Sequence, residues 1–535
     1  MRLGKLPRAA LTGMAAAAAL MAAALVPTVG VTASSPSSRP LVVAYDADAV
    51  SMDPAQVTDI NTMQALTQIY QPLVAWSPTV KGKLVGVLAT SWSHNPSDTQ
   101  YTFQLRHGVR FSDGTPFNAE AVVFSFERQL DPSNPDYKYG PYPFGSFFFG
   151  NLKSVAAEGP YKVVFTMKSP DASLLNLLTT ATAFIVSPTT AMKDKGTFAL
   201  HGAGTGPYEV SKWQRGVQLV LTRNPDYWGP KGASSEIVFI PAVQSDARVS
   251  DLQSGTADIA VDPTPSSLAS LVSTGRFGVL KGVGPHVWWV GLNTLDKPLS
   301  SPLVREALNY AVNKQAIVKG ILYDTGTPAN QPLSSSQMGF NQSLGSYTYD
   351  PAKAKALLKE AGYPHGFSVN FFVPTSGSGM QEPVAMGEAI QEYLQAVGIK
   401  VKIVELDWGT FLGKINAGAK KSGADMWELS WMDSAVDPSL VLGPLLVKSS
   451  WPPGFNSGFY SDAKVNSLVA QALGETNPAK RAQMYAEAEA LINKDAPWIF
   501  VDHADAVYAY SKSVKGFSLN PTFPFLINLS TAYVQ

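Results

Sequence analysis

Residues 101–132 constrain the fold of this chain more than any other stretch, because a strand, a turn and a helix can be read there in order. Apolar and polar residues alternate over 101–105, which is the period of a strand that buries one face. Ser112, Asp113 and Gly114 have turn chemistry. Asn118 is a good helix N-cap, and apolar residues recur at helical spacing over 119–130 until an Asp-Pro pair ends the helix. The segment predicts a half-buried strand and an amphipathic helix, and it contains no catalytic group.

The length and composition of the chain restrict its class. Its 535 residues exceed the ~250–300 over which one hydrophobic core usually grows, so we expect at least two lobes. Basic and acidic residues number 41 each, which favours neither nucleic acid nor an anionic membrane as a partner. Cysteine is absent, which excludes disulfide bonds, thiolate catalysis and thiolate metal sites.

Residues 1–33 have the pattern of a secretory signal peptide. Basic residues precede an apolar run over 9–26, and small residues follow it up to Ala33, where we expect cleavage. The alternative is an uncleaved anchor, because 18 apolar residues are near the lower limit for spanning a bilayer. Residues 34–40 form a polar linker, and no later segment is long and apolar enough to span.

The segment 101–132 closely resembles the signature segment of the peptide/nickel class of bacterial extracytoplasmic solute-binding proteins, family 5, which are the receptors of ABC importers. One departure is Ser112, which stands where many members carry His. Further matches occur in the family's order across nearly the whole mature chain: DPA at 53–55, LATSW at 88–92, GTGPY at 204–208, LTRNPDYWG at 221–229, LQSGTADIA at 252–260, VREALNYAV at 304–312, AKALLKEAGY at 354–363 and DAPWIFV at 495–501.

This resemblance implies an α/β fold: the two-lobed periplasmic-binding-protein fold of type II, in its large cluster C form, with an extra subdomain in lobe I. On that fold we expect lobe I over residues 41–284, with the subdomain at 76–190. Lobe II then covers 285–505, and residues 506–535 return to lobe I. Many members carry a lipid-modified Cys after the signal. Because this chain has none, we expect it to be periplasmic or at the cell surface, without a lipid anchor on Cys.

A strand at 367–373, a helix at 384–397 and a strand at 399–406 predict a parallel crossover. A further helix near 411–417 leads to another strand at 425–431. In parallel sheets, ligands bind outside the carboxyl ends of the strands. The loops at 374–381 and 432–438 are therefore candidate parts of a site.

The second of these loops contains Trp431, Met432, Asp433 and Ser434. An aromatic surface beside a carboxylate suits an amine-bearing or hydroxyl-rich ligand. For Trp431 a core role and a cleft role both remain open, and Asp437 before Pro438 is interpreted as a helix cap.

The resemblance adds detail about the ligand. In members that bind dipeptides, an Asp three residues after the Trp pairs with the ligand ammonium, and an Arg in the earlier loop pairs with its carboxylate. This chain has Ser434 and Gly377 at those places, with Asp433 as a possible substitute one residue earlier. We therefore expect an oligopeptide rather than strictly a dipeptide. An oligosaccharide, an amine or a metal chelate remains the alternative.

Other candidate residues also follow from the resemblance. The loop with Thr58, Asp59 and Asn61 aligns with a cleft loop of the family, and Tyr460 lies in a segment that matches its cleft side. The aromatic, proline-rich loop at 137–149 is open to two interpretations, a lid packed on its own side chains or a ligand contact.

Catalysis has little support in the sequence. We find no G-x-S-x-G, H-E-x-x-H or phosphate-loop motif, and the six histidines lack ligand spacing. We expect no enzymatic activity, no cofactor and no metal. The implied mechanism is capture of a small molecule or peptide by hinge closure, followed by delivery to the permease subunits of an ABC importer by a monomer that binds no nucleic acid. A secreted hydrolase and an envelope interaction protein are the alternatives from other classes.

Overall fold

The structure is a computed structural model that describes residues 39–377 and 379–535. The predicted signal peptide and nearly all of the predicted linker lie outside the described residues. The described residues belong to one compact unit, Pro36–Gln535. None of the helices described has the length and apolar content needed to cross a membrane.

A 12-stranded sheet organises the fold, with the strand order β16-β15-β17-β13-β18-β11-β1-β10-β9-β8, and β12 and β14 pairing with β18. Its strands are β1 (Leu41–Tyr45), β8 (Tyr208–Gln214), β9 (Gln218–Arg223), β10 (Glu236–Pro241), β11 (Ile259–Val261), β12 (Phe277–Val283), β13 (His286–Leu292), β14 (Gly326–Pro328), β15 (Ser368–Pro374), β16 (Lys400–Leu406), β17 (Met426–Met432) and β18 (Trp498–Ser511).

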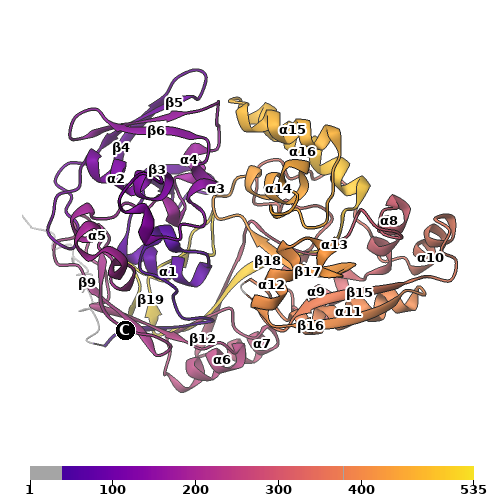
Figure 1. The fold of residues 1–535 in the computed structure, drawn as a ribbon. Helices are drawn as coiled ribbons and strands as arrows, with labels where there is room; N and C mark the ends of the chain where they lie inside the picture. The colour runs from indigo at the N-terminus through magenta and orange to yellow at the C-terminus, as the bar shows by residue number, and fades with distance from the viewer. Residues whose placement is uncertain (1–38, 378) are drawn as a thin grey trace, which may run out of the picture. The chain divides into compact units, whose positions relative to one another are not determined.

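The helices lie around the sheets of the fold (Figure 1). They are α1 (Ile60–Ile69), α2 (Ala119–Leu130), α3 (Gly145–Phe149), α4 (Leu174–Leu177), α5 (Pro188–Asp194), α6 (Ser245–Ser254), α7 (Leu268–Ser273), α8 (Pro302–Ala311), α9 (Lys314–Gly320), α10 (Pro351–Glu360), α11 (Pro383–Ala396), α12 (Trp408–Asn416), α13 (Ala419–Ser422), α14 (Ser439–Leu446), α15 (Ala463–Gly474) and α16 (Pro478–Asp495).

The segment that opened the sequence analysis folds as predicted. Strand β5 (Gln100–Leu105) buries Tyr101, Phe103 and Leu105 and lies inside a second, four-stranded sheet of order β4-β5-β7-β6. Its other strands are β4 (Ala89–His94), β6 (Leu152–Ala157) and β7 (Lys162–Met167). The Asn118 side chain caps α2 by accepting a hydrogen bond from the Ala121 N–H at 3.0 Å. Phe126 of α2 packs edge-to-face on Phe165 of β7, which closes the core of this layer.

At one end of the large sheet, β1 runs parallel to both β10 and β11. Leu41, Val43, Ile237 and Ile259 from these strands lie in one buried cluster with Leu66 and Ile69 of α1. Strand β1 ends at Tyr45 and β11 ends at Val261, so the chain leaves this part of the sheet at Asp46 and Asp262.

At the other end, β15 runs parallel to β16 and to β17, and α11 connects β15 to β16. The parallel crossover predicted from the sequence is therefore confirmed. Its apolar residues pack with those of β13 and α8 in one core. The two predicted loops leave the sheet at the carboxyl ends of β15 and β17.

Strand β18 is the longest strand of the large sheet, and its two halves have different partners. Strands β13 and β14 pair with its first half, and β11 and β12 pair with its second half. Ser301 is the N-cap residue of α8, although its side chain makes no capping hydrogen bond.

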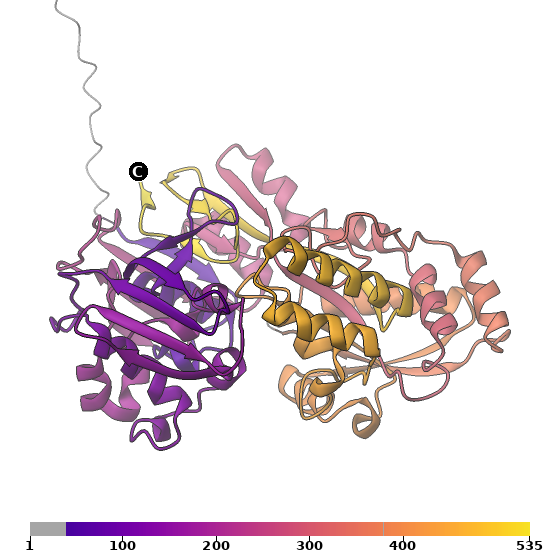
Figure 2. The same cartoon turned by 90° about the horizontal axis from the view of Figure 1, so that it is seen from above.

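The last two long helices precede β18. Asn477 caps α16 by accepting hydrogen bonds from the N–H groups of Ala479 and Lys480. Helices α15 and α16 lie side by side, in orange to yellow in Figure 2. Three short two-stranded sheets complete the fold: β2 (Val74–Trp76) with β3 (Leu84–Gly86), β19 (Val514–Lys515) with β22 (Tyr533–Val534), and β20 (Ser518–Leu519) with β21 (Ile527–Asn528).

Candidate functional site

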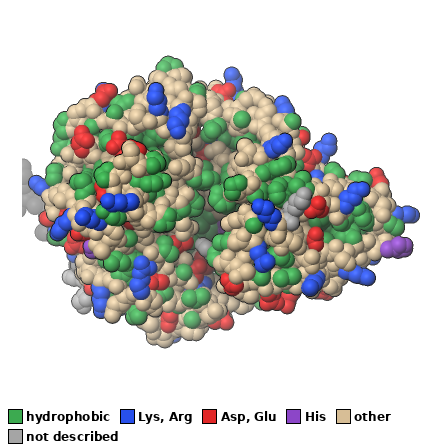
Figure 3. Space-filling view, viewed as in Figure 1, with side chains coloured by type: hydrophobic (Ala, Val, Ile, Leu, Met, Phe, Trp, Pro, Cys, Tyr) green, Lys and Arg blue, Asp and Glu red, His purple; other side chains and the backbone are tan. Residues whose placement is uncertain are grey.

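A cavity opens where elements before residue 284 meet elements after residue 285. It consists of two adjoining hollows of about 290 and 460 Å³. Both hollows share lining residues, among them Asp59, His286 and Met432, so they form one continuous cavity. Figure 3 shows the surface hollowed near its centre, with hydrophobic side chains gathered at the border of the hollow. A cavity of this size suits a small molecule or a short peptide.

The smaller hollow, called here the apolar end, is lined mainly by aromatic and aliphatic side chains. They are Val57, Ile60, Met63, Phe144, Phe147, Phe148, Trp408, Leu412, Leu429, Trp431, Met432, Leu440 and Phe455. Phe147 of α3 lies edge-on to Phe455, with ring centroids 5.7 Å apart. The ring centroids of Phe147 and Trp431 are 6.4 Å apart. The aromatic residues of the loop at 137–149 pack on one another, as one of its two interpretations required, and several of them also line the cavity. The other interpretation, contact with a ligand, stays a prediction.

Trp431 is held in place by a hydrogen bond. Its indole N–H donates to the Leu440 carbonyl oxygen at 2.8 Å, so the ring faces the apolar end in a fixed orientation. An aromatic face fixed in this way gives apolar contact area at little entropic cost, because its rotamer is already chosen.

The larger hollow, called here the acidic end, is lined by five carboxylate side chains and one guanidinium. The carboxylates belong to Asp46, Asp48, Asp59, Asp262 and Glu382. The guanidinium belongs to Arg248, which donates hydrogen bonds to the carbonyl oxygens of Ala242, Val243, Val261 and Asp262 at 2.6–2.9 Å. Within the described chain, all the hydrogen bonds that Arg248 donates go to the backbone, so it does not neutralise the carboxylates by direct contact.

His286 lies at the junction of the two ends. Burial lowers the pKa of His286 to about 4, so its imidazole is neutral at pH 7. Its Nδ1 atom is buried and has no hydrogen-bond partner among the described residues. A neutral imidazole at this place can donate or accept one hydrogen bond to a solute.

Most of the residues predicted from the sequence line the cavity. Thr58, Asp59, Trp431, Met432 and Ser434 line the apolar end. Asn61 lines the acidic end, together with Asp59 and Met432. The two loops chosen from sheet topology also contribute to the lining, the first through residues 375–377 and 379–381.

Asp433 does not line the cavity. It is 1% exposed, and its carboxylate accepts hydrogen bonds from the Gln337 amide at 2.8 Å and the Ala435 N–H at 3.1 Å. Burial raises the pKa of Asp433 well above its usual value. Asp433 lies just beyond the last residue of β17, so strand alternation does not set its direction. Its hydrogen bonds hold the side chain inside the protein, where it supports the loop.

Tyr460 also lies outside the cavity lining. It is 5% exposed, and its hydroxyl donates a hydrogen bond to Asp495 at 2.8 Å. Its side chain packs in the core beside α15 and α16. The sequence match placed Tyr460 in the right segment, but the segment turns its side chain inward.

Asp437 forms a buried ion pair. Its carboxylate accepts hydrogen bonds from both Arg481 Nη atoms at 2.8 and 2.9 Å, and from the Ser439 N–H at the start of α14. Burial alone would raise the pKa of Asp437, but the Arg481 guanidinium outweighs it and lowers that pKa. The Asn176 amide donates to the same carboxylate at 3.0 Å, so a residue of α4 contacts the loop after β17. The N-cap residue of α14 is Pro438, one residue after the predicted cap, although Asp437 accepts the hydrogen bond from the first N–H of the helix. The ion pair was not foreseen.

The sequence analysis missed two acidic residues, Asp46 and Asp262. Ligands bind outside the carboxyl ends of parallel strands, and each of these residues directly follows such a strand. The same rule would have predicted them, but parallel strands were recognised only in the later half of the chain. His286 and Trp408 were not foreseen as lining residues either.

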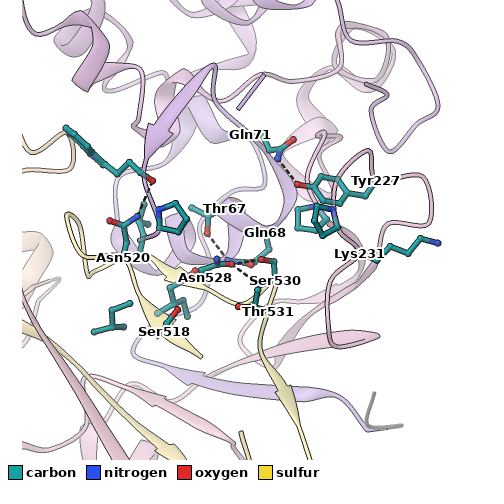
Figure 4. Close-up of a pocket in the computed structure, with 17 residues that line it drawn as sticks. Thr67, Gln68, Gln71, Tyr227, Lys231, Ser518, Asn520, Asn528, Ser530 and Thr531 are labelled. Atoms are coloured by element: carbon teal, nitrogen blue, oxygen red, sulfur yellow. Dashed lines mark hydrogen bonds between the residues drawn. The ribbon is translucent and has the colours of Figure 1, made fainter. Parts of the chain in front are cut away.

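Another cavity of about 370 Å³ lies apart from this one and shares none of its lining residues. It is bordered by α1, β20 and β21, and its polar groups include Gln68, Asn528 and Thr531. Figure 4 shows the Gln71 amide bonded to the Tyr227 hydroxyl at one side of this cavity, at 2.9 Å. The Gln68 side-chain amide likewise donates hydrogen bonds to the carbonyl oxygens of Gln64 and Ile527. None of the residues predicted as ligand contacts lies here.

No group of three or more potential metal ligands occurs within residues 39–377 and 379–535.

Comparison with known proteins defines the class. Residues 83–453 match the family described as bacterial extracellular solute-binding proteins, family 5. The chain is 32% identical to the glutathione-binding protein GsiB of Shigella flexneri over 494 residues, which cover 91% of this chain and 94% of that protein. The corresponding GsiB of Escherichia coli strain K12 has the same identity and coverage. This chain belongs to family 5 of the bacterial extracellular solute-binding proteins.

Solved structures agree with this assignment. The ABC transporter-associated periplasmic binding protein DppA of Helicobacter pylori, in complex with the peptide STSA, has a TM-score of 0.81 and 31% identity, over 93% of this chain and 98% of that chain. A dipeptide-binding protein from Pseudoalteromonas sp. SM9913, in complex with Met-Leu, has a TM-score of 0.81 and 27% identity, over 93% of this chain and all of that chain. The protein has the two-lobed α/β fold of periplasmic binding proteins, as the resemblance implied.

Proposed function

We propose that this protein captures a peptide, most simply an oligopeptide, between its two lobes and delivers it to the permease subunits of an ABC importer. The observation that carries this proposal is the continuous cavity lined from both sides of the fold, in a member of a solute-binding family. The names of two relatives support the peptide class, since one binds glutathione and another was solved with the peptide STSA.

The lining favours longer peptides over strict dipeptides. Arg248 is the one Arg or Lys among the described lining residues of the two ends, and its donors are already used by backbone carbonyls. A dipeptide carboxylate would therefore lie in the cavity without a charged partner, which is costly when the group is desolvated. A longer peptide can place its carboxyl terminus outside the cavity.

The proposed contact residues are Thr58, Asp59, Asn61, Trp431, Met432 and Ser434. Asp433 is assigned the role of a positioning residue, because its carboxylate holds the loop through Gln337 and the Ala435 N–H. Tyr460 is assigned a structural role.

The proposed lobe boundaries are those expected from the sequence. Lobe I covers 41–284 and 506–535, lobe II covers 285–505, and residues 76–190 form the subdomain of lobe I. Strand β18 then passes from lobe II to lobe I and serves as part of the hinge, since each of its halves pairs with strands of a different lobe.

The proposal includes location and the absence of catalysis. Residues 1–33 direct export with cleavage near Ala33, and the mature protein is periplasmic or at the cell surface without a lipid-modified Cys. The relatives named above are binding proteins, and the solute is released unchanged.

Native mass spectrometry of the purified protein tests the proposal, because a co-purified solute would be seen directly as an added mass. We expect a peptide, bound one to one, and contraction of the ligand-free protein in small-angle scattering when that peptide is added back. Turnover of the solute, or failure of every solute to cause contraction, would overturn the proposed function.

A further inference from the structure

The acidic end of the cavity has charges that no part of the described chain neutralises by direct contact. Asp46 follows β1 and Asp262 follows β11, and these parallel strands are neighbours in the sheet. Asp46 and Asp262 therefore lie close together at the carboxyl ends of neighbouring strands, and both line the acidic end. Asp59, the N-cap of α1, lies beside them and also lines this end.

Two buried acceptor atoms at the acidic end lack a partner. The Asp46 Oδ1 atom is buried and accepts no hydrogen bond from the described residues. Asn61 is 2% exposed, lines the acidic end, and its Oδ1 atom likewise has no donor in the described chain. Buried acceptors are rarely left unsatisfied in folded proteins, so these atoms call for N–H or O–H donors brought by a solute or by water.

The electrostatic environment agrees with this geometry. Burial and then the neighbouring Asp46 charge raise the pKa of Asp262 to about 7, against the opposing effects of the Arg248 charge and of a hydrogen bond from the Val507 backbone. Burial also raises the pKa of Asp59, against the opposing effect of its hydrogen bonds from Thr62, and the Asp46 charge adds to the rise. The carboxylates repel one another in a partly dry cavity, and a bound cation would relieve that repulsion.

The other groups at this end do not replace such a cation. The side chain of Asp48 accepts hydrogen bonds from the Gly216 N–H and the Trp213 indole. His286 is neutral at pH 7 for the reason given above. Arg248 donates its hydrogen bonds to backbone carbonyls, and its one positive charge offsets only part of the charge of Asp46 and Asp262.

We propose that the acidic end binds a cationic ammonium or guanidinium group of the solute, held by Asp46, Asp262 and Asn61, while an apolar part of the same solute occupies the apolar end. This inference rests on the proposed function and names its substrate class: cationic peptides, or peptides held by their amino terminus, with an apolar residue adjoining the charge. The proposed amine site thus lies in lobe I. In dipeptide-binding members of the family, the Asp that pairs with the ligand ammonium is expected at the position of Ser434, in lobe II.

Three matched probes distinguish the source of the cation. Ala-Phe-Leu-amide carries an ammonium at its amino terminus, acetyl-Lys-Phe-Leu-amide carries one on a side chain, and acetyl-Ala-Phe-Leu-amide carries none. By calorimetry with the full mature protein, we expect one or both cationic probes to bind at least about tenfold more tightly than the neutral probe. The preference for the cationic probes should decrease as the salt concentration is raised, because salt screens the carboxylates of the open cavity.

Variants test the assigned residues. In Asp46→Asn combined with Asp262→Asn, the preference for the cationic probe should fall to about twofold or less, with the neutral probe bound as in the wild type. Glu388→Gln is the matched control, since Glu388 lies exposed on α11 outside the lining and the substitution removes the same kind of charge. Circular dichroism and the thermal midpoint verify that the double variant is folded. Should it be unfolded, Asn61→Leu replaces it, because loss of the Asn61 acceptor should weaken the cationic probe selectively.

If neither cationic probe binds better than the neutral one, including the case in which no probe binds, this inference is overturned. A preference that survives in the double variant overturns the assignment to Asp46 and Asp262. Failure of the proposed function has a separate signature: no solute co-purifies and no tested solute contracts the protein in scattering.

Discussion

Arg481 and Asp437 form an ion pair whose side chains are 4% and 0% exposed, so neither charge can turn to water if its partner is removed. We expect Arg481→Met to reduce the free energy of unfolding by about 3–5 kcal/mol, because it leaves a desolvated carboxylate without a counter-ion. The urea midpoint measures this. The double variant with Asp437→Asn should be less destabilised than the single one, and a single variant within about 1 kcal/mol of the wild type would contradict the expectation.

His503 is 5% exposed, and burial lowers its pKa to about 4, against 6.5 for the unfolded chain. Its folded-state pKa is depressed, so the unfolded state binds more protons between pH 6.5 and 4. The stability contribution is full above pH 6.5 and is lost as the pH falls toward 4. Relative to the wild type, His503→Gln should therefore gain up to about 3 kcal/mol over that interval.

Urea unfolding at several pH values measures this difference. His365→Gln is the control, because His365 is exposed on the turn before β15. A wild-type curve parallel to that of His503→Gln from pH 7 to 4 would refute the burial argument.

Helix α2 is a short element whose start depends on one side chain. Asn118→Ala removes the acceptor for the Ala121 N–H, and we expect a loss of about 1 kcal/mol in the free energy of unfolding. Asn118→Asp should retain nearly all of the stability, because Asp caps as well as Asn. Equal losses in both variants, measured by urea unfolding, would show that the cap is not the cause.

Helix α3 brings Phe147 against Trp431 and Phe455 at the apolar end. It thereby connects the proposed subdomain to the proposed second lobe. Phe147→Ala should weaken solute affinity about fivefold, corresponding to the ~1 kcal/mol that an aromatic contact adds beyond its area. Calorimetry with the co-purified solute measures this. Tyr137→Ala, at a 38% exposed aromatic residue of the same loop, should leave the affinity unchanged. Unchanged affinity in Phe147→Ala would mean that α3 lines the cavity without stabilising the closed form.

We expect the proposed closure to involve the whole molecule, because the two proposed lobes also contact each other outside β18. The Ala172 N–H donates to the Leu473 carbonyl oxygen at 3.0 Å, which brings the chain before α4 next to α15. The chain has no cysteine, so a disulfide introduced at this contact would be the sole one. We expect Ala172→Cys with Leu473→Cys, once oxidised, to keep its solute through dialysis and to release it on reduction.

Each single cysteine variant is the control and should release its solute under both conditions. Native mass spectrometry before and after dialysis measures how much of the protein still holds its solute. Rapid release from the oxidised double variant would show that opening does not separate these two segments.

The sequence alone was sufficient to predict several local elements of secondary structure. The alternation over residues 101–105, the cap at Asn118 and the crossover from β15 to β16 were all correctly predicted, because period, capping chemistry and crossover direction act between near neighbours. Two loops of the cavity also followed from the rule for parallel strands. The ordered set of motifs pointed to the family, and the family comparison agrees with it.

Other features depended on how distant segments pack. Asp46 and Asp262 are more than two hundred residues apart and meet because β1 and β11 pair in parallel, which no local pattern expresses. Asp433 and Tyr460 lie in the predicted segments but face inward, since the direction of a side chain at the end of a strand depends on which neighbours fill the space there. Local chemistry thus accounts for the elements of this protein. The parallel pairing of β1 with β11, which joins segments far apart in the sequence, accounts for the charge that gathers in its cavity.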